Sequence, residues 1–330
     1  MTDEIAAFLA AAGWSEAQRA PLAGDASARR YERLRRGRET AVLMVAPPGP
    51  EIARFAQIDL WLRQNGFSAP QILAQDEASG LMLLEDLGDA LVARLTTADP
   101  AREAPLYAAI TAFLLDLHRI APPAFLAPLD GPALGDLVSL TAAWYPVRDA
   151  EAARDLPALI SQEFALRDTL DPVTCLRDFH AENVLWLPER QGVQRLGLLD
   201  FQDAVAAHPA YDLVSALQDA RRDVSPALEQ REIARYVAAR GLDPVEFEVV
   251  YALLGAQRAL RILGIFSRLC LGLGKPGYLA LMPRVWRNLE RNLAQPALTA
   301  LADLVQAAYD PPDEMMLQRM RDACGSHPTP

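Results

Sequence analysis

A strand-rich island between Val173 and Val205 interrupts the helical second half of this chain and limits its fold more than any other feature. Its two core strands are predicted at residues 184–188 and 195–200. Helical periodicity surrounds the island on both sides. We therefore expect a small hairpin held inside a large helical lobe.

The first ninety residues have a different pattern, because strands dominate them. After a short helix at residues 3–13, strands are predicted at 19–24, 29–36, 39–47, 70–76 and 81–86, with a helix at 51–65. The acidic, glycine-containing segment EDLGD that follows is typical of a connector between lobes. We predict an α+β fold with a β-rich lobe over residues 1–88 and a mainly helical lobe over residues 89–330.

Composition narrows the classes of function. With 330 residues, of which 51% are hydrophobic, the chain is long enough for one large or two modest domains. Its net charge of −11 disfavours binding to nucleic acids and to anionic membranes. The three cysteines have no paired spacing, the start lacks a basic signal region, and no charge-free apolar run is long enough for a membrane span. We expect a soluble, cytoplasmic, monomeric protein.

The strongest chemical signal is the segment RDFHAEN at residues 177–183, which an apolar strand follows. Its Asp178 and Asn183 keep the spacing of the kinase catalytic loop H-R-D-L-x-x-x-N. A carboxylate beside an incoming hydroxyl aligns it and accepts its proton, which makes Asp178 the candidate catalytic base. The Asn183 amide oxygen is a suitable ligand for Mg²⁺.

A second signal is LLDFQD at residues 198–203, where an apolar strand leads directly into Asp200. We predict that Asp200 bridges Mg²⁺ to the β- and γ-phosphates of ATP. Asp203 is a possible second ligand, a sugar contact or a structural acid. The alternative is that these residues only cap turns, but their order and the surrounding lobes favour a kinase.

The loop AGDASAR at residues 23–29 separates the first two predicted strands. In a kinase fold this loop covers the ATP phosphates, where backbone N–H groups and the Ser27 hydroxyl contact oxygen atoms. It has one glycine instead of G-x-G-x-x-G, and a polar hairpin turn explains it equally well.

Together, the segments GDASARRY, AVLM, EDLGD, RDFHAENVLWL and LLDFQDA resemble the aminoglycoside phosphotransferase (choline kinase-like) superfamily over nearly the whole chain. The late block QRALRILGIFSR at residues 257–268 makes the resemblance closer to bacterial anomeric kinases of N-acetylmuramate and N-acetylglucosamine. The resemblance implies a protein-kinase-like two-lobe fold, ATP and Mg²⁺ as cofactors, and an amino sugar phosphorylated at its anomeric hydroxyl for cell-wall recycling.

The resemblance also implies roles by position. It assigns the catalytic base and the magnesium ligands to the same residues as the motifs do. Glu85 and Leu87 correspond to hinge residues whose backbone meets adenine. Asp212 corresponds to the acid that buttresses the catalytic loop, and Ser27 lies on the phosphate loop.

Two positions depart from the family pattern. Leu176 stands where many relatives have a packing and hydrogen-bonding histidine. Met44 stands where the third strand carries a lysine for the α- and β-phosphates, and Lys275 is the only lysine in the chain. We hypothesise that Arg29 or Arg30 supplies this charge; the alternative is that both are solvated strand residues.

Contacts with the acceptor are predicted in two regions. His180 in the catalytic loop either touches the sugar or orients the loop. Arg258, Arg261 and Arg268 share a face of one predicted helix. We take Arg268 as the candidate partner of the lactyl carboxylate of N-acetylmuramate, and the alternative is a solvated helix face.

Two other functions stay open. In one, the acceptor is an aminoglycoside or another hydroxyl-bearing metabolite. In the other, the chain is a nucleotide-binding regulator without transfer activity, which would account for the missing lysine. The intact Asp178, Asn183 and Asp200 argue against the regulator, because a protein that only binds nucleotide has no need of a base.

Overall fold

The computed structural model describes residues 2–22 and 29–327, and the chain forms two compact units. The first unit consists of Met1–Ala109 and Asp178–Ala204, and the second of Ile110–Arg177 and Val205–Pro330. The expected boundary at residue 88 falls inside the first unit. This unit extends further along the chain and also contains the predicted catalytic hairpin.

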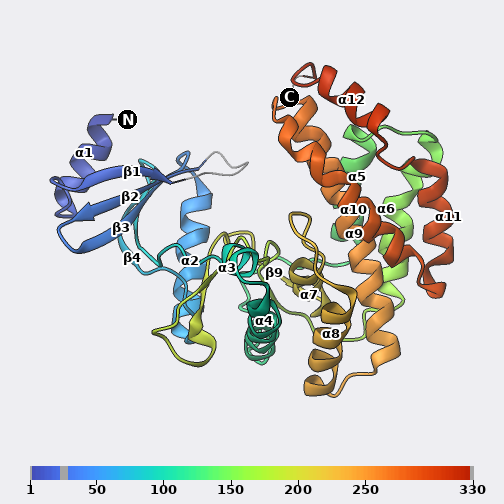
Figure 1. The fold of residues 1–330 in the computed structure, drawn as a ribbon, viewed down its shortest axis with the longest axis horizontal. Helices are drawn as coiled ribbons and strands as arrows, with labels where there is room; N and C mark the ends of the chain where they lie inside the picture. The colour runs from blue at the N-terminus through green and yellow to red at the C-terminus, as the bar shows by residue number, and fades with distance from the viewer. Residues whose placement is uncertain (1, 23–28, 328–330) are drawn as a thin grey trace. The chain divides into compact units, whose positions relative to one another are not determined.

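The first unit is built on an antiparallel sheet with the strand order β1-β2-β3-β5-β4 (Figure 1). Its strands are β1 (Gln18–Leu22), β2 (Arg30–Arg36), β3 (Glu39–Val45), β4 (Ile72–Asp76) and β5 (Leu81–Glu85). The turn between β2 and β3 contains Gly37 at a φ of 59°, a conformation that glycine adopts without steric cost. These elements confirm the predicted strands, whose ends shift by only one or two residues.

Both faces of the sheet are buried at its centre. Helices α1 (Thr2–Ala11) and α2 (Pro50–Gln64) lie beside the sheet, and α3 (Val92–Ala98) follows the connector (Figure 1). Ile5 of α1 packs in one apolar cluster with Leu43 and Leu83 of the sheet. Met44 and Met82 are buried too, and strand alternation directs them to the opposite face.

A small hairpin in the first unit consists of two strands, β7 (Val184–Trp186) and β8 (Leu196–Leu198). The Leu198 amide donates to the Ser68 carbonyl at 2.9 Å. Just beyond the hairpin, the Phe201 ring packs 4.8 Å from the Phe55 ring of α2. Such contacts explain why the hairpin groups with the β-rich part of the chain and not with its helical neighbours in sequence.

The second unit is mainly helical, as predicted. α4 (Glu103–Leu117) leads into it, and its other helices are α5 (Gly131–Trp144), α6 (Ala150–Ala165), α7 (Ala210–Leu217), α8 (Pro226–Arg240), α9 (Pro244–Leu271), α10 (Met282–Leu293), α11 (Thr299–Ala308) and α12 (Glu314–Asp322). Two short strands, β6 (Val173–Cys175) and β9 (Val205–Ala207), pair antiparallel within it. α9 packs against α5, α7 and α10 and is the central helix of this unit.

α9 begins with a side-chain cap. The Asp243 carboxylate accepts hydrogen bonds from the Val245 and Glu246 amides, and Pro244 occupies the first turn, where its missing N–H costs nothing. By length and composition alone, this helix could cross a membrane. However, 78% of its most apolar stretch is buried inside the fold.

Candidate active site

The β7–β8 hairpin brings the two predicted magnesium ligands to one end. Val184 pairs with Leu198, and the amide of Leu199 donates to the Asn183 carbonyl at 2.9 Å. Asn183 directly precedes β7, and Asp200 follows β8. Antiparallel pairing therefore places these two residues at the same end of the hairpin.

A tight turn adds Asp178 to this end. The Asn183 side-chain amide donates to the Asp178 carbonyl at 2.9 Å, and the Asn183 backbone amide donates to the His180 carbonyl at 2.8 Å. Because the Nδ2 atom makes the first bond, this network orients the Oδ1 atom as an acceptor directed away from the turn. Asp178, Asn183 and Asp200 are thus brought together within the first unit.

His180 is buried beside Asn183. Its Nε2 atom lies 3.5 Å from Asn183 Nδ2, and the ring is almost fully removed from solvent. The contact places His180 within the catalytic loop, and its role in orienting that loop stays a prediction. A contact with the sugar stays a prediction.

Asp200 leaves β8 in a left-handed backbone conformation, with a φ of 56°. Non-glycine residues rarely adopt this conformation, and it is common at functional sites. The Asp200 side chain is 39% exposed and accepts hydrogen bonds from the Arg29 guanidinium at 2.6 Å and from Gln202 Nε2 at 3.0 Å. Gln202 Nε2 also lies 3.4 Å from Asp203 Oδ2, so one amide connects the two carboxylates. Asp200 is held by its neighbours while part of it stays open to solvent.

Arg29 links Asp200 to the first turn of α2. Its Nε atom lies 3.3 Å from Glu51 Oε1, and the Arg29 side chain is only 8% exposed. Burial opposes the charged form of the guanidinium, but attraction to Tyr31 and to the two carboxylates outweighs burial, and the pKa of Arg29 is raised. Arg29 therefore stays cationic between two acids.

Arg30 has a different environment. It is the first residue of β2, and its side chain is exposed. Met44, at the position of the missing lysine, is buried and pairs with Tyr31 across β2 and β3. Of the two arginines predicted to replace the lysine, Arg29 is the one that contacts a predicted site residue.

The acidic connector after β5 is held by two arginines. Arg33 of β2 pairs with Asp86 at 2.9 Å and with Asp89 at 2.6 Å. Arg190, which follows β7, pairs with Glu85 at 2.5 Å. These ion pairs fix the connector against the sheet and the hairpin of the first unit.

The predicted nucleotide contacts are described in part. The Glu85 amide donates to the Gln71 carbonyl at 2.8 Å, so this N–H already serves the sheet. Leu87 is half-buried and packs closely on Gly197 of β8. A Cβ atom built on Gly197 would lie only 3.2 Å from Leu87 Cδ1. The predicted adenine contact is consequently left to the Glu85 carbonyl and the Leu87 backbone. Ser27 of the predicted phosphate loop lies outside the described residues.

Asp212 of α7 lies in the second unit and is fully buried. Its carboxylate accepts hydrogen bonds from the Leu176 amide at 2.6 Å and the Arg177 amide at 3.0 Å. These are the two residues directly before Asp178. The role of Asp212 as the acid that buttresses the catalytic loop stays a prediction, and these two hydrogen bonds are the contacts on which it would depend.

The three arginines of α9 differ in their surroundings. Arg258 is buried, Arg261 is half-buried and donates to the Tyr211 hydroxyl at 3.3 Å, and Arg268 is exposed near the end of the helix. A shared helix face therefore does not give them a shared environment. The contact of Arg268 with a sugar carboxylate stays a prediction.

Sequence reasoning missed Glu51 and Gln202. Glu51 follows a proline in the first turn of α2, a position that acids favour, but nothing in the sequence pairs it with Arg29. Gln202 stands between Asp200 and Asp203 in the sequence. An amide flanked by two acids is the sequence feature that could have indicated its contacts with both carboxylates. Its two donors suit it to hold both carboxylates.

Known proteins resemble this chain in sequence and in fold. The profile of the Phosphotransferase enzyme family matches residues 18–247. The N-acetylmuramate/N-acetylglucosamine kinase of Caulobacter vibrioides is 42% identical, over 90% of this chain and 93% of that protein. The protein of the same name from Pseudomonas aeruginosa is 31% identical, over 89% of this chain and 90% of that protein.

A solved structure, that of a choline/ethanolamine kinase family protein from Mesorhizobium loti, superposes with a TM-score of 0.59. The match covers 92% of this chain and 99% of that chain, at 18% sequence identity. At this identity the likeness establishes the fold alone. It confirms the predicted α+β fold with a small β-rich part and a larger helical part.

Proposed function

Because the chain belongs to the phosphotransferase enzyme family, we propose that it is an ATP-dependent kinase of N-acetylmuramate and N-acetylglucosamine, acting at the anomeric hydroxyl in the recycling of cell-wall sugars. The observation that carries the proposal is the convergence of Asp178, Asn183 and Asp200 at one end of the β7–β8 hairpin. The acceptor is inferred from the names of the two bacterial relatives.

Asp178 is the catalytic base of this reaction. It accepts the proton of the sugar hydroxyl while that oxygen bonds to the γ-phosphorus of ATP, and the bond from this phosphorus to the β–γ bridging oxygen breaks to release ADP. Phosphoryl transfer needs little covalent chemistry from the protein, so positioning supplies most of the rate. The Asn183 hydrogen bond to the Asp178 carbonyl is one source of that positioning.

Asn183 and Asp200 fit a magnesium site. Their free donor atoms are an amide oxygen and a carboxylate oxygen, which Mg²⁺ prefers. The Asn183 nitrogen is already bonded at 2.9 Å, which leaves its oxygen for a cation, and Asp200 is partly open to solvent. Mg²⁺ held there would neutralise charge on the β- and γ-phosphates.

Arg29 takes the place of the missing lysine. In protein kinases that lysine pairs with a helix glutamate close to the aspartate that holds magnesium. Arg29 makes the corresponding links, to Glu51 at 3.3 Å and to Asp200 at 2.6 Å. A guanidinium presents two parallel N–H groups to phosphate oxygens, so it serves this role with a different geometry from lysine.

The first test is ADP release with Mg-ATP against N-acetylmuramate, N-acetylglucosamine, kanamycin, choline and homoserine. We expect turnover on the two N-acetyl sugars, and a sugar 1-phosphate in the phosphorus NMR spectrum. Asp178→Asn should abolish turnover, and Asp155→Asn, which changes an exposed aspartate of α6, should not. Turnover on kanamycin alone would move the proposal to an aminoglycoside kinase. ATP binding without turnover on any acceptor would favour the regulator.

Arg29 and Arg30 form a matched pair for the phosphate contact. We expect Arg29→Ala to raise the KM for ATP by roughly 10-fold or more, because a charge-assisted contact is lost. Arg29→Lys should recover part of that loss, and Arg30→Ala should leave the KM for ATP unchanged. Equal KM values in Arg29→Ala and the unmodified enzyme would contradict the assignment.

We also expect a cytoplasmic monomer. All three cysteines lie among the described residues and are unpaired, and two of them are buried, which suits a reducing compartment. Size-exclusion chromatography with light scattering should give one species near 36.1 kDa. A species of twice this mass would contradict the expectation of a monomer.

A further inference from the structure

The residue before the catalytic base has an unusual backbone. Arg177 has a φ of 68°, in the left-handed region. A non-glycine residue keeps such a conformation only where its neighbours over-determine it. The contacts of Arg177 therefore show which residues fix the backbone directly before Asp178.

Both polar groups of the Arg177 backbone are bonded within the second unit. Its N–H donates to Asp212 Oδ1 at 3.0 Å. Its carbonyl oxygen accepts two hydrogen bonds, from Ser215 Oγ at 2.9 Å and from Arg258 Nη1 at 2.9 Å. A carbonyl oxygen has two lone pairs, so this acceptor is saturated.

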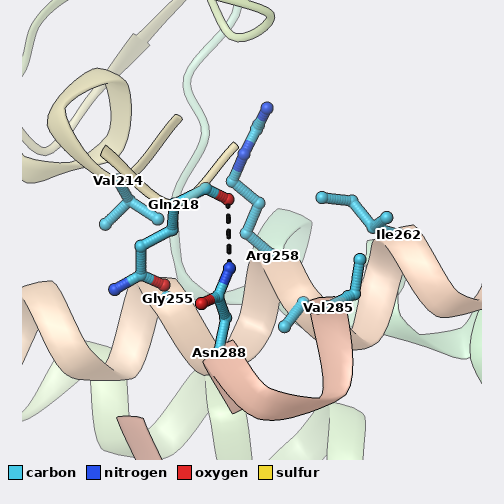
Figure 2. Close-up of a pocket in the computed structure, with 8 residues that line it drawn as sticks. Val214, Gln218, Gly255, Arg258, Ile262, Val285 and Asn288 are labelled. Carbon is cyan, nitrogen blue, oxygen red and sulfur yellow. Dashed lines mark hydrogen bonds between the residues drawn. The ribbon is translucent and has the colours of Figure 1, made fainter. Parts of the chain in front are cut away.

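The donors come from buried positions on two packed helices. Ser215 lies three residues after Asp212 on α7 and therefore on the same helix face. Arg258 extends from α9 beside a small pocket that α7 and α10 also line (Figure 2). Arg258 is only 6% exposed, and its guanidinium carbon lies 5.5 Å from the centre of the Tyr211 ring. A buried cation stacked on an aromatic ring is held in one place.

We propose that Ser215 and Arg258 are positioning residues that fix the catalytic base through the carbonyl of Arg177. This carbonyl belongs to the planar peptide group that ends at the Cα atom of Asp178. Two donors on its oxygen fix the tilt of that plane, and hence the direction in which the Asp178 side chain leaves the backbone. The inference rests on the proposed function, because it concerns the base of that reaction.

A positioning role for Arg258 can be distinguished by kinetics from a role in binding the sugar. An arginine that bound the lactyl carboxylate would affect the KM for N-acetylmuramate and spare N-acetylglucosamine, which lacks that group. A positioning residue acts on the base instead, so its loss lowers kcat equally for both sugars. The guanidinium contact with the Arg177 carbonyl and the burial of Arg258 favour the second case.

The test compares Arg258→Ala, Arg258→Lys and Ser215→Ala with Arg287→Ala, which changes an exposed arginine of α10. We expect Arg258→Ala to lower kcat by roughly 10- to 100-fold on both sugars with little change in either KM, because small displacements of a reacting group are costly. Ser215→Ala should lower kcat by roughly 3- to 10-fold, since one of two donors remains. Arg258→Lys should recover part of the rate, and Arg287→Ala should equal the unmodified enzyme.

Hydrogen exchange gives a readout that does not depend on turnover. Mass spectrometry of a peptide covering residues 176–180 should show faster amide exchange in Arg258→Ala and Ser215→Ala and no change in Arg287→Ala. If Arg258→Ala does not fold, Ser215→Ala and Arg258→Lys carry the test.

Two outcomes would overturn the proposal. One is unchanged kcat and unchanged exchange in both Ser215→Ala and Arg258→Lys. The other is a KM effect confined to N-acetylmuramate. If the unmodified enzyme turns over none of the sugars, the proposed function fails, while the exchange data still decide whether these residues hold the Arg177 backbone.

Discussion

Asp200 at the end of β8 and Asp212 in α7 are both acids beside the candidate active site in sequence, yet their surroundings are opposite. Asp200 is 39% exposed and bonded to side chains, those of Arg29 and Gln202. Asp212 is fully buried and bonded to the backbone amides that precede Asp178. A carboxylate that is proposed to meet a phosphate-bound cation needs access to solvent. A carboxylate that shapes a loop needs partners in the backbone of that loop.

Asp59 of α2 shows a third case. It is 2% exposed, and its Oδ1 atom has no hydrogen-bond partner among the described residues. Burial raises the pKa of Asp59 to about 7, while Arg63 opposes the rise. A buried carboxylate without donors such as those of Asp212 therefore holds its proton near neutral pH.

The sharpest test of the comparison is Asp200→Asn. We expect kcat to fall by about 10²- to 10³-fold or more, because the proposed magnesium ligand loses its charge. Thermal unfolding should change little, since the carboxylate is partly exposed. A large drop in melting temperature would show that Asp200, like Asp212, is mainly structural.

Asp212→Ala should have the largest effect on stability. It leaves the buried Leu176 amide and the partly buried Arg177 amide without an acceptor, and each unsatisfied buried group costs about 1–3 kcal/mol. We expect the free energy of unfolding in urea to fall by about 2–4 kcal/mol, together with kcat. Full stability with reduced kcat would mean that the loop amides find other acceptors and that the contrast with Asp200 is smaller than the structure indicates.

Asp59→Asn should give a smaller effect that depends on pH. The pKa of Asp59 is raised in the folded state, so its stabilising contribution is full below an unfolded pKa near 4 and is lost as the pH rises through about 7. The variant should match the unmodified protein near pH 4 and exceed its stability at pH 8 by about 1–3 kcal/mol. Urea unfolding at both pH values measures this, and a pH-independent difference would contradict the raised pKa.

Local patterns predicted much of this molecule. The strands of the sheet and the helical character of the second unit follow from the periodicity of the apolar residues. The spacing of Asp178 and Asn183 sufficed to mark the turn, because that turn is a contact between near neighbours in the chain.

The remaining features depend on pairings across the chain, which a single sequence does not contain. Arg29 and Asp200 are separated by 171 residues, and Arg177 and Arg258 by 81. Glu51 belongs to the site because the first turn of α2 lies beside Arg29, the residue directly before β2. The hairpin groups with the first unit for the same reason, since it contacts residues distant in sequence such as Ser68.

The divided first unit has a consequence during synthesis. Its sheet leaves the ribosome well before Asp178–Ala204, and between the two pieces lie all the residues from Ile110 to Arg177. At typical translation rates of about 5–20 residues per second, the nascent sheet waits roughly 5–20 seconds for its hairpin. During this interval the Ser68 carbonyl and the Phe55 ring lack the partners that they have in the finished protein. Codon usage and chaperone binding over this stretch are therefore expected to affect the yield of folded protein more than elsewhere in the gene.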